Sequence, residues 1–231
     1  MANNFYNAVV RNVSADSTLP TEVYKVPDTK KAILIELDVA NKSSAGVTVT
    51  VQMLDESQNQ TYDTTGTTIN ANASTVAITT GVTGLFTTNS SAAHNLIVND
   101  RVSFTGTAPS FTNAALPPSG DSALSVDAGT GSKFYYVQEK TSNSTFKIAE
   151  TKDATAALTF DNGGSNVKMV KVFLADIVKD APVPVGGSLK VISGQKLVIE
   201  SAHANVNDKL YVYTSSANAV DAIGSVLQEV S

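Results

Sequence analysis

The stretch Ala32-Ile33-Leu34-Ile35-Glu36-Leu37-Asp38-Val39 decides the fold class of this chain. Apolar residues recur at every second position from Ile33 to Val39, and Glu36 and Asp38 lie between the later ones. A period of two is typical of a β-strand with one buried face. The stretch therefore predicts a strand whose alternating apolar residues, beginning with Ile33, face a hydrophobic core.

A second alternating run follows the first along the chain. Val47 to Met53 alternates apolar residues with Thr and Gln, and a polar turn at 41–46 precedes it. Two strands joined by a short polar turn commonly form an antiparallel pair. We therefore expect 32–39 and 47–53 to be neighbours in one sheet. Shorter strands are expected upstream, at 8–13 and 22–26.

The composition of the whole chain agrees with an all-β protein. Hydrophobic residues make up 42% of the 231 residues and charged residues only 16%, which is below the roughly 25% of typical soluble domains. The remainder is shifted toward Ser, Thr, Asn and Gly, which supply strand surfaces and turns. A low charge density also suits a surface that contacts other proteins.

Charge and cysteine content argue against several classes of function. The net charge is −5, and no stripe of Lys and Arg is present of the kind that binds nucleic acid. Cysteine is absent, which excludes disulfides and cysteine-bound zinc. The first residues lack the features of a secretory signal, and no apolar run is long enough to span a bilayer. We expect synthesis in a cytoplasm and no membrane anchor.

The character of the sequence changes twice, which predicts two domains. After Gln58 the chain is rich in Thr, Asn, Gly and Ala, and from Val167 the alternating apolar pattern returns. Neither end segment supplies enough strands for a closed sandwich. We therefore predict a discontinuous β-sandwich, jelly-roll-like, formed by residues 1–70 and 167–231. A second small β domain, residues 71–166, interrupts it. The short strands expected within this domain are 76–79, 101–104, 134–138, 145–149 and 158–160.

Two segments of this plan need separate treatment. Residues 108–131 contain Pro109, Pro117 and Pro118 with several Gly, so we expect an exposed loop that reaches a neighbouring molecule. The last run, 220–230, fits either a strand or a helix by its spacing. The strand is favoured, because Gly224 and the β-branched residues disfavour a helix.

Residues suited to catalysis or ligand binding are few. His94 and His203 lie in polar turn contexts, where a structural role is the simpler interpretation. The run Asp161 to Asn166 offers several oxygen ligands, but it lacks the alternating carboxylates of a calcium loop and fits a hairpin turn better. No nucleophile elbow or phosphate-binding loop is present. We predict no catalytic residue, no cofactor and no metal.

A contact surface is the remaining kind of site. Tyr135 and Tyr136 follow Phe134 and could form a stacking platform for sugars or bases, although packing across the strand is the favoured alternative. The 108–131 loop adds Phe111 and Leu116. Together Phe111, Leu116, Tyr135 and Tyr136 form the predicted contact surface.

Several stretches resemble small virion structural proteins of tailed bacteriophages, notably marine ones. The resemblance lies in Glu22-Val23-Tyr24-Lys25-Val26-Pro27, in Lys30-Lys31-Ala32-Ile33-Leu34-Ile35, and in the segment from Val178 to Leu189 that leads to Gly194-Gln195-Lys196-Leu197-Val198-Ile199-Glu200. In those proteins the second half usually follows the first directly, which agrees with an insertion here.

The inserted segment resembles a β module of phage tail and fibre proteins. The similarity lies in His94-Asn95-Leu96, in Asn99-Asp100-Arg101-Val102-Ser103-Phe104, and in Phe134-Tyr135-Tyr136-Val137 with Ser144-Thr145-Phe146-Lys147-Ile148. Familiar versions often carry Gly at the positions of Asn95 and Asn99. Asn tolerates the left-handed backbone region better than other non-glycine residues, so both positions are predicted to have a positive φ.

These resemblances imply a non-enzymatic structural protein of a bacteriophage virion. A head decoration or cement subunit is the leading hypothesis, with partners that are other virion proteins and copies of itself. A homo-oligomer is expected because sandwich edges must be paired or covered, and a trimer is the first expectation for its symmetry. The alternatives are a neck, tail or baseplate component, a tail module that binds a receptor or glycan, and a polysaccharide-degrading tail enzyme. The last lacks any nominated pair of carboxylates.

Overall fold

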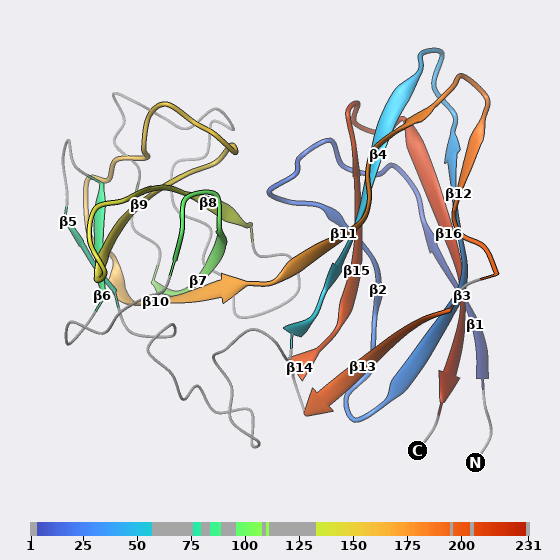
Figure 1. Ribbon diagram of the computed structural model, residues 1–231, viewed down its shortest axis with the longest axis horizontal. Helices are drawn as coiled ribbons and strands as arrows, with labels where there is room; N and C mark the ends of the chain where they lie inside the picture. The colour runs from blue at the N-terminus through green and yellow to red at the C-terminus, as the bar shows by residue number, and fades with distance from the viewer. Residues whose placement is uncertain are drawn as a thin grey trace. The chain divides into compact units, whose positions relative to one another are not determined.

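The computed structural model describes residues 4–56, 76–79, 84–88, 96–107, 110, 133–194, 196–203 and 206–229. It divides into two compact units (Figure 1). The first unit contains the described residues up to Glu56 and those from Phe173 onward. The second contains the described residues from Val76 to Val172. The first unit is therefore discontinuous in sequence.

The first unit is a sandwich of two antiparallel sheets. Sheet A has the order β1-β16-β3-β13-β14, and β12 also pairs with β3; sheet B has the order β11-β4-β15-β2. The strands of sheet A are β1 (Asn4–Val10), β3 (Lys31–Asn41), β12 (Ser188–Ile192), β13 (Leu197–His203), β14 (Val206–Asn207) and β16 (Val220–Glu229). Those of sheet B are β2 (Thr21–Lys25), β4 (Val47–Leu54), β11 (Leu174–Val183) and β15 (Lys209–Thr214). The predicted all-β, sandwich-like fold is confirmed.

The core of the sandwich lies between the two sheets. Sheet A contributes Leu34 and Leu37 from β3, and sheet B contributes Val49 from β4 and Val212 from β15; all are fully buried. β16, the segment with two possible interpretations, is a strand that pairs with β3 over its whole length. The strand interpretation is thus confirmed for 220–229, and Val230 lies outside the described residues.

The predicted pairing of 32–39 with 47–53 is wrong, because β3 and β4 belong to different sheets. The turn between them crosses from sheet A to sheet B. Asn41 stabilises this crossing: its buried Nδ2 donates to the carbonyl oxygens of Ala45 at 2.8 Å and of Val183 at 3.1 Å. The inward apolar faces of the two strands meet across the core instead of lying side by side.

The predicted inward face of β3 is also partly wrong. The register of β3 against β16 passes from Glu36 opposite Ser225 to Leu34 opposite Val226, so Ile35 has no partner and forms a bulge. The inward residues are Leu37 and Val39 on one side of the bulge but Ala32 and Leu34 on the other. Ile33 therefore faces outward, because a one-residue slip exchanges the two faces of a strand.

The second unit is one antiparallel sheet with the order β10-β7-β8-β9-β6-β5. β5 and β10, at the two ends of this order, lie close together, so the sheet curls around its core. Its strands are β5 (Val76–Thr79), β6 (Leu85–Thr88), β7 (Arg101–Thr107), β8 (Tyr135–Lys140), β9 (Thr145–Ala149) and β10 (Ser165–Val172). Because β10 pairs with β7, the boundary falls after Val172 and not at 167 as predicted.

Aromatic packing fills the core of the second unit. Phe86 lies at the centre, with ring centroids 5.1 Å from Phe104, 5.2 Å from Phe146 and 5.4 Å from Phe160. Leu158 and Phe160 are buried there but do not form the strand expected at 158–160, whereas β6 was not expected. Asn99 has a φ of 71°, which confirms the predicted positive φ; Asn95 lies outside the described residues.

The two points where the chain leaves and re-enters the sandwich are adjacent. The amide of Asp55 donates to the carbonyl oxygen of Phe173 at 3.3 Å, and Leu54 pairs with Leu174. Replacing residues 57–172 by a short Gly-Ser bridge should therefore leave a sandwich that unfolds cooperatively, because the bridge closes a hairpin between β4 and β11. Thermal unfolding followed by circular dichroism tests this. A product without a cooperative transition would contradict it.

A buried ion pair provides a second test, within the inserted unit. Lys133 Nζ lies 2.7 Å from Glu150 Oε1, and both side chains are almost completely buried. Lys133→Met leaves the Glu150 carboxylate buried without this cation, so we expect a loss of about 3 to 5 kcal/mol in the free energy of unfolding. The double variant K133M/E150L should recover most of it. Hydrogen exchange of the β9 amides measures both; a cost under about 1 kcal/mol for K133M would contradict the expectation.

Candidate interaction surface

The contact surface predicted around the paired tyrosines is wrong where the structure describes it. Tyr135 and Tyr136 are both buried in the second unit. Tyr135 lies 6.0 Å from Phe104 between ring centroids, so the alternative of aromatic packing is confirmed for it. Phe111 and Leu116 lie outside the described residues.

Tyr136 is occupied by an internal contact. Arg101 Nη2 donates to the Tyr136 hydroxyl at 2.8 Å, and the guanidinium carbon lies 5.0 Å from the ring centroid. The face and the polar end of this ring are therefore both used within β7 and β8. A stacking platform for sugars at Tyr136 would require the ring to leave this contact.

The structure places the other sequence candidates only in part. His203 ends β13 and pairs with Val206, and His94 lies outside the described residues. In the 161–166 segment, Asn162 Oδ1 accepts from the amide of Gly164 at 3.1 Å, as in an Asx turn. Among the described residues no group of three or more His, Asp or Glu side chains is placed to hold a metal ion.

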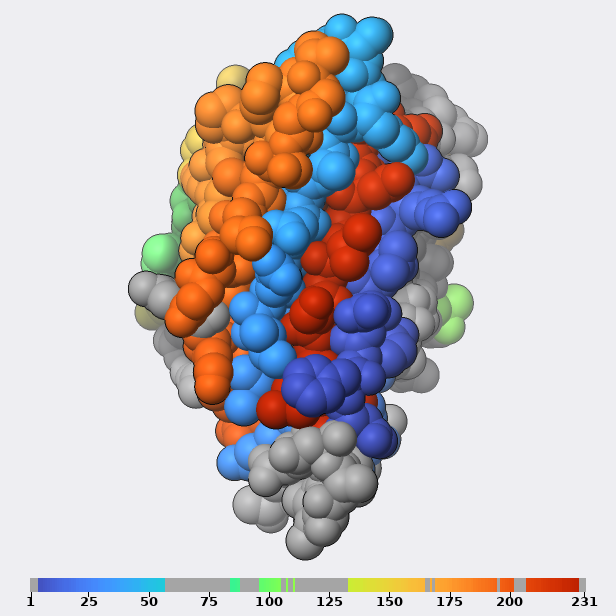
Figure 2. All heavy atoms as spheres, turned by 90° about the vertical axis from the view of Figure 1, so that its right-hand side faces the viewer, coloured from blue at the N-terminus to red at the C-terminus, as the bar shows by residue number. Residues whose placement is uncertain are grey.

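The outward face of sheet A carries a continuous row of apolar side chains. Phe5 on β1 pairs with Leu227 on β16, Leu227 pairs with Ile33 on β3, and Ile33 pairs with Val198 on β13. We call these four residues the apolar row. Phe5 is 79% exposed and Val198 57% exposed, while Leu227 and Ile33 are partly exposed. Figure 2 views this face, with β12, β3, β16 and β1 side by side from orange through light blue and red to dark blue.

A second, shorter apolar contact lies farther along the same face. Val9 on β1 pairs with Ile223 on β16, and each is about half exposed. Charged residues lie around these apolar positions. Pairs that bridge neighbouring strands are Lys31 with Glu200, Lys190 with Glu36, and Lys42 with Asp221. An apolar centre with a polar rim is the usual anatomy of a protein interface.

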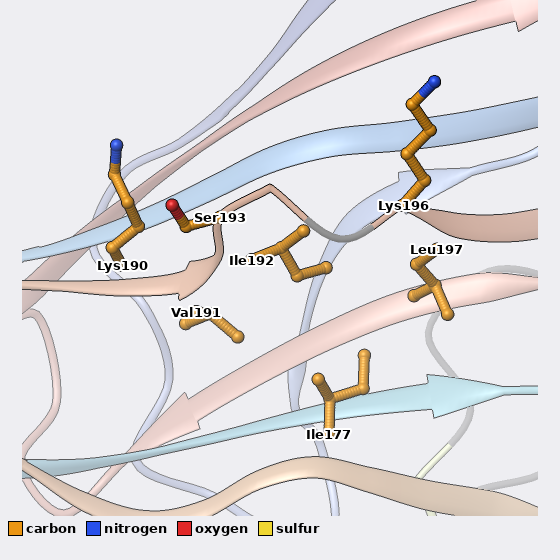
Figure 3. Close-up of a pocket in the computed structure, with 7 residues that line it drawn as sticks. All are labelled: Ile177, Lys190, Val191, Ile192, Ser193, Lys196 and Leu197. Carbon is orange, nitrogen blue, oxygen red and sulfur yellow. The ribbon is translucent and has the colours of Figure 1, made fainter.

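A cleft lies at the edge of the sandwich, beside the turn between β12 and β13. One edge of β3 pairs with β12 through residues 37–40 and with β13 through residues 31–34, so the two partners separate at the bulge. The cleft has a volume of about 410 Å³. Figure 3 shows apolar side chains around it and two lysines that project beside it; its lining comprises Ile177, Lys190, Val191, Ile192, Ser193, Lys196 and Leu197.

The groups around the cleft suit association better than chemistry. Lys190 Nζ lies 2.5 Å from Glu36 Oε1, and this hydrogen bond raises the pKa of Lys190. Ser193 is the sole hydroxyl among its described lining residues, which include no His and no carboxylate. The arrangement offers apolar surface and positive charge to a neighbouring molecule.

A polar cluster holds the strands together where the chain leaves the sandwich. Asp208, between β14 and β15, accepts hydrogen bonds from the amides of Glu200 at 2.9 Å and Glu56 at 3.1 Å. The adjacent Asn207 is fully buried and donates to Asp28 at 2.7 Å. Burial raises the pKa of Asp208 to about 6; the amide hydrogen bonds oppose this shift, and the charge of Asp55 adds to it.

The raised pKa of Asp208 predicts a pH dependence of stability. Between the unfolded value of 3.8 and about 6, the folded protein holds a proton that the unfolded chain has released. The free energy of unfolding contributed by this group therefore falls as the pH rises through that range, and is constant above it. In Asp208→Asn this fall should be absent. The free energy of unfolding of the variant relative to wild type should therefore increase as the pH rises through this range. Urea titrations from about pH 4.5 to 6.5 measure it.

Asp221 provides a matched control, because its pKa is shifted below the usual value of an aspartate. The hydrogen bond from Lys42 lowers the pKa of Asp221, so that group is ionised in both states over the same interval. The difference between wild type and Asp221→Asn should therefore be flat there. A flat difference for Asp208→Asn as well would contradict the assignment.

Comparison of the chain with protein-family models, with curated proteins and with solved structures found no match. In the part of the chain that the structure describes, no helix is long and apolar enough to cross a membrane. The resemblance to phage proteins therefore stays a prediction that rests on the sequence stretches quoted for it.

The alternating pattern alone does not predict the apolar row, because it identifies only the face of each strand that packs in the core. A signal was available in two places. Leu197-Val198-Ile199 and Ile33-Leu34-Ile35 are apolar at three consecutive positions, so both faces of those strands carry apolar residues. A sheet with one solvated face alternates instead.

Proposed function

We propose that this chain is a non-enzymatic structural protein of a bacteriophage virion, a head decoration or cement subunit that packs on other virion proteins. The observation that carries the proposal is the apolar row on the outward face of sheet A. Exposed, contiguous apolar surface with a charged rim is characteristic of protein interaction sites. The resemblance of the 22–35 and 178–200 stretches to small virion proteins supports the class of partner.

The size of this face suits a stable contact. Four strands about 4.8 Å apart and on average roughly nine residues long present on the order of 550 Å², which approaches the roughly 800 Å² that each partner contributes to a standard interface. The sandwich provides a rigid support, because the same strands are buried on their inner side. The low charge density of the chain limits the desolvation cost of covering it.

A neck, tail or baseplate subunit is the alternative that uses the same surface. The glycan-binding alternative depended on Tyr135, Tyr136 and the 108–131 loop. Both tyrosines are buried, which removes the part of its surface that the structure describes, and the loop lies outside the described residues apart from Ser110. The number of copies per particle separates head from tail. Quantitative mass spectrometry of purified particles should find hundreds of copies for a head subunit and a dozen or fewer for a neck or tail subunit. Absence of the chain from purified particles would overturn the proposal.

Substitution of the apolar row tests whether that surface makes the contact. Val198→Ser removes apolar area from an exposed position, so we expect unchanged folding but reduced binding to particles that lack the protein. Val185→Ser is the matched control, since Val185 is 59% exposed but lies in the turn between β11 and β12. Co-sedimentation with such particles measures both variants. Equal binding by the two variants would contradict a role for the row.

A further inference from the structure

β1 forms one edge of sheet A. We propose that β1 pairs antiparallel with β1 of a second copy of this chain, with Asn7 facing Asn7 of that copy across a two-fold axis. Sheet A would then continue through the dimer. This pairing involves the sandwich alone and is independent of the virion role, so a monomeric protein would not contradict that role.

The edge at β1 lacks the features that protect sheet edges from pairing. Its sequence, Asn-Phe-Tyr-Asn-Ala-Val-Val, contains no charge and no proline, and its seven residues pair with β16 without a bulge. Among the described residues no strand pairs with its other side. Charges, prolines and bulges are the usual protection of such edges.

The other sandwich edges that the structure describes have this protection. β2 has a register shift against β15 and two charged residues, and β12 has a register shift against β3 and one lysine. β11 has two register shifts against β4 and a positive φ at Asp180. β14, at the opposite end of sheet A, is only two residues long and has a register shift against β13. The protecting residues are Glu22 and Lys25 on β2, Lys190 on β12, and Asp176, Lys179, Asp180 and Pro182 on β11. β1 is therefore the edge suited to strand addition.

The faces of β1 restrict the register of such a pair. Ala8 belongs to the buried core, whereas Phe5 and Val9 face outward. Directly opposed residues in an antiparallel pair lie on the same face. The outward residues of β1 have odd numbers. The outward faces of both copies therefore lie on the same side of the joined sheet only in registers that place odd-numbered residues of one copy opposite odd-numbered residues of the other. Registers centred on Tyr6, Asn7 or Ala8 meet this condition.

Among these, the register centred on Asn7 gives complementary pairs on both faces. It places Phe5 opposite Val9 of the second copy, an aromatic with a β-branched residue, and Tyr6 opposite the small Ala8. Centring on Tyr6 would oppose Phe5 with Asn7, and centring on Ala8 would oppose it with the charged Arg11. The Asn7 amides can hydrogen-bond to each other on the axis.

This register also makes the apolar surface continuous between the copies. The apolar row of one copy, which ends at Phe5, would meet Val9 and Ile223 of the other, and the reverse contact would form by symmetry. Each chain carries a net charge of −5, yet the described outward positions on β1 and on β16 from 223 to 227 are uncharged. The copies can therefore approach at this edge without like-charge contact.

Charge substitution on the axis tests the pairing directly. Asn7→Lys brings two ammonium groups together in the dimer, and Asn7→Asp brings two carboxylates together, so each variant alone should dimerise about tenfold more weakly or worse. An equimolar mixture of the two variants should restore the dimer, because the axis then holds an opposite-charge pair. Sedimentation velocity of the full chain over a range of concentrations measures all four samples, with wild type as the reference.

A control variant separates this pairing from other modes of association. Ser225 pairs with Asn7 in the same row of the sheet but lies one strand from the edge, so Ser225→Lys should leave the dimer intact. Loss of association in S225K as well would indicate stacking of the outward faces and overturn the proposal. A monomeric wild type, a trimer insensitive to Asn7→Lys, or a mixture that fails to restore the dimer would each overturn it too.

Discussion

Strand β3 pairs with two short strands on one edge and with a single long strand on the other. This pairing constraint determines how the sandwich is arranged. β16 pairs along its full length, while β12 and β13 share the opposite edge. The extra residue, Ile35, is accommodated as a bulge where those partners separate. The outward position of Ile33 follows from this single bulge.

The outward position of Ile33 links the packing of the sheet to its exposed chemistry. Without the slip, Ile33 would belong to the core with Leu37, and the row from Phe5 to Val198 would be interrupted at its centre. Instead four strands contribute apolar side chains at the same level of the sheet. A bulge in one strand thus completes an apolar surface that extends across four strands of sheet A.

Much of the fold could be predicted from the sequence, because alternation and turn residues act locally. The strands at 76–79 and 145–149 were placed with their observed bounds, and the all-β class followed from composition. Pairing could not be predicted in the same way. Alternation shows that β3 has an apolar face but not which strand lies beside it, and the contacts of Asn41 that send the chain to the other sheet involve residues 142 positions away.

The candidate surface was harder to predict than the fold for a related reason. Adjacent aromatic residues such as Tyr135 and Tyr136 look alike in sequence whether they line a core or a surface, and here the inserted unit uses them internally. Phe5 and Val198 are separated by almost the whole chain, and only the order of strands in sheet A brings them into one row. Surfaces of this kind are properties of the topology.

The hydrogen bond between Asp55 and Phe173 has a consequence for engineering. It places the two ends of the inserted unit at neighbouring positions on adjacent strands, in the geometry of an ordinary hairpin. A foreign domain whose own termini lie close together could replace the inserted unit, because the two connections lie at the ends of β4 and β11 and the core of the sandwich does not depend on what joins them. The sandwich could in this sense serve as a scaffold for displaying another domain, which would be joined to it by two chain connections at neighbouring positions on β4 and β11.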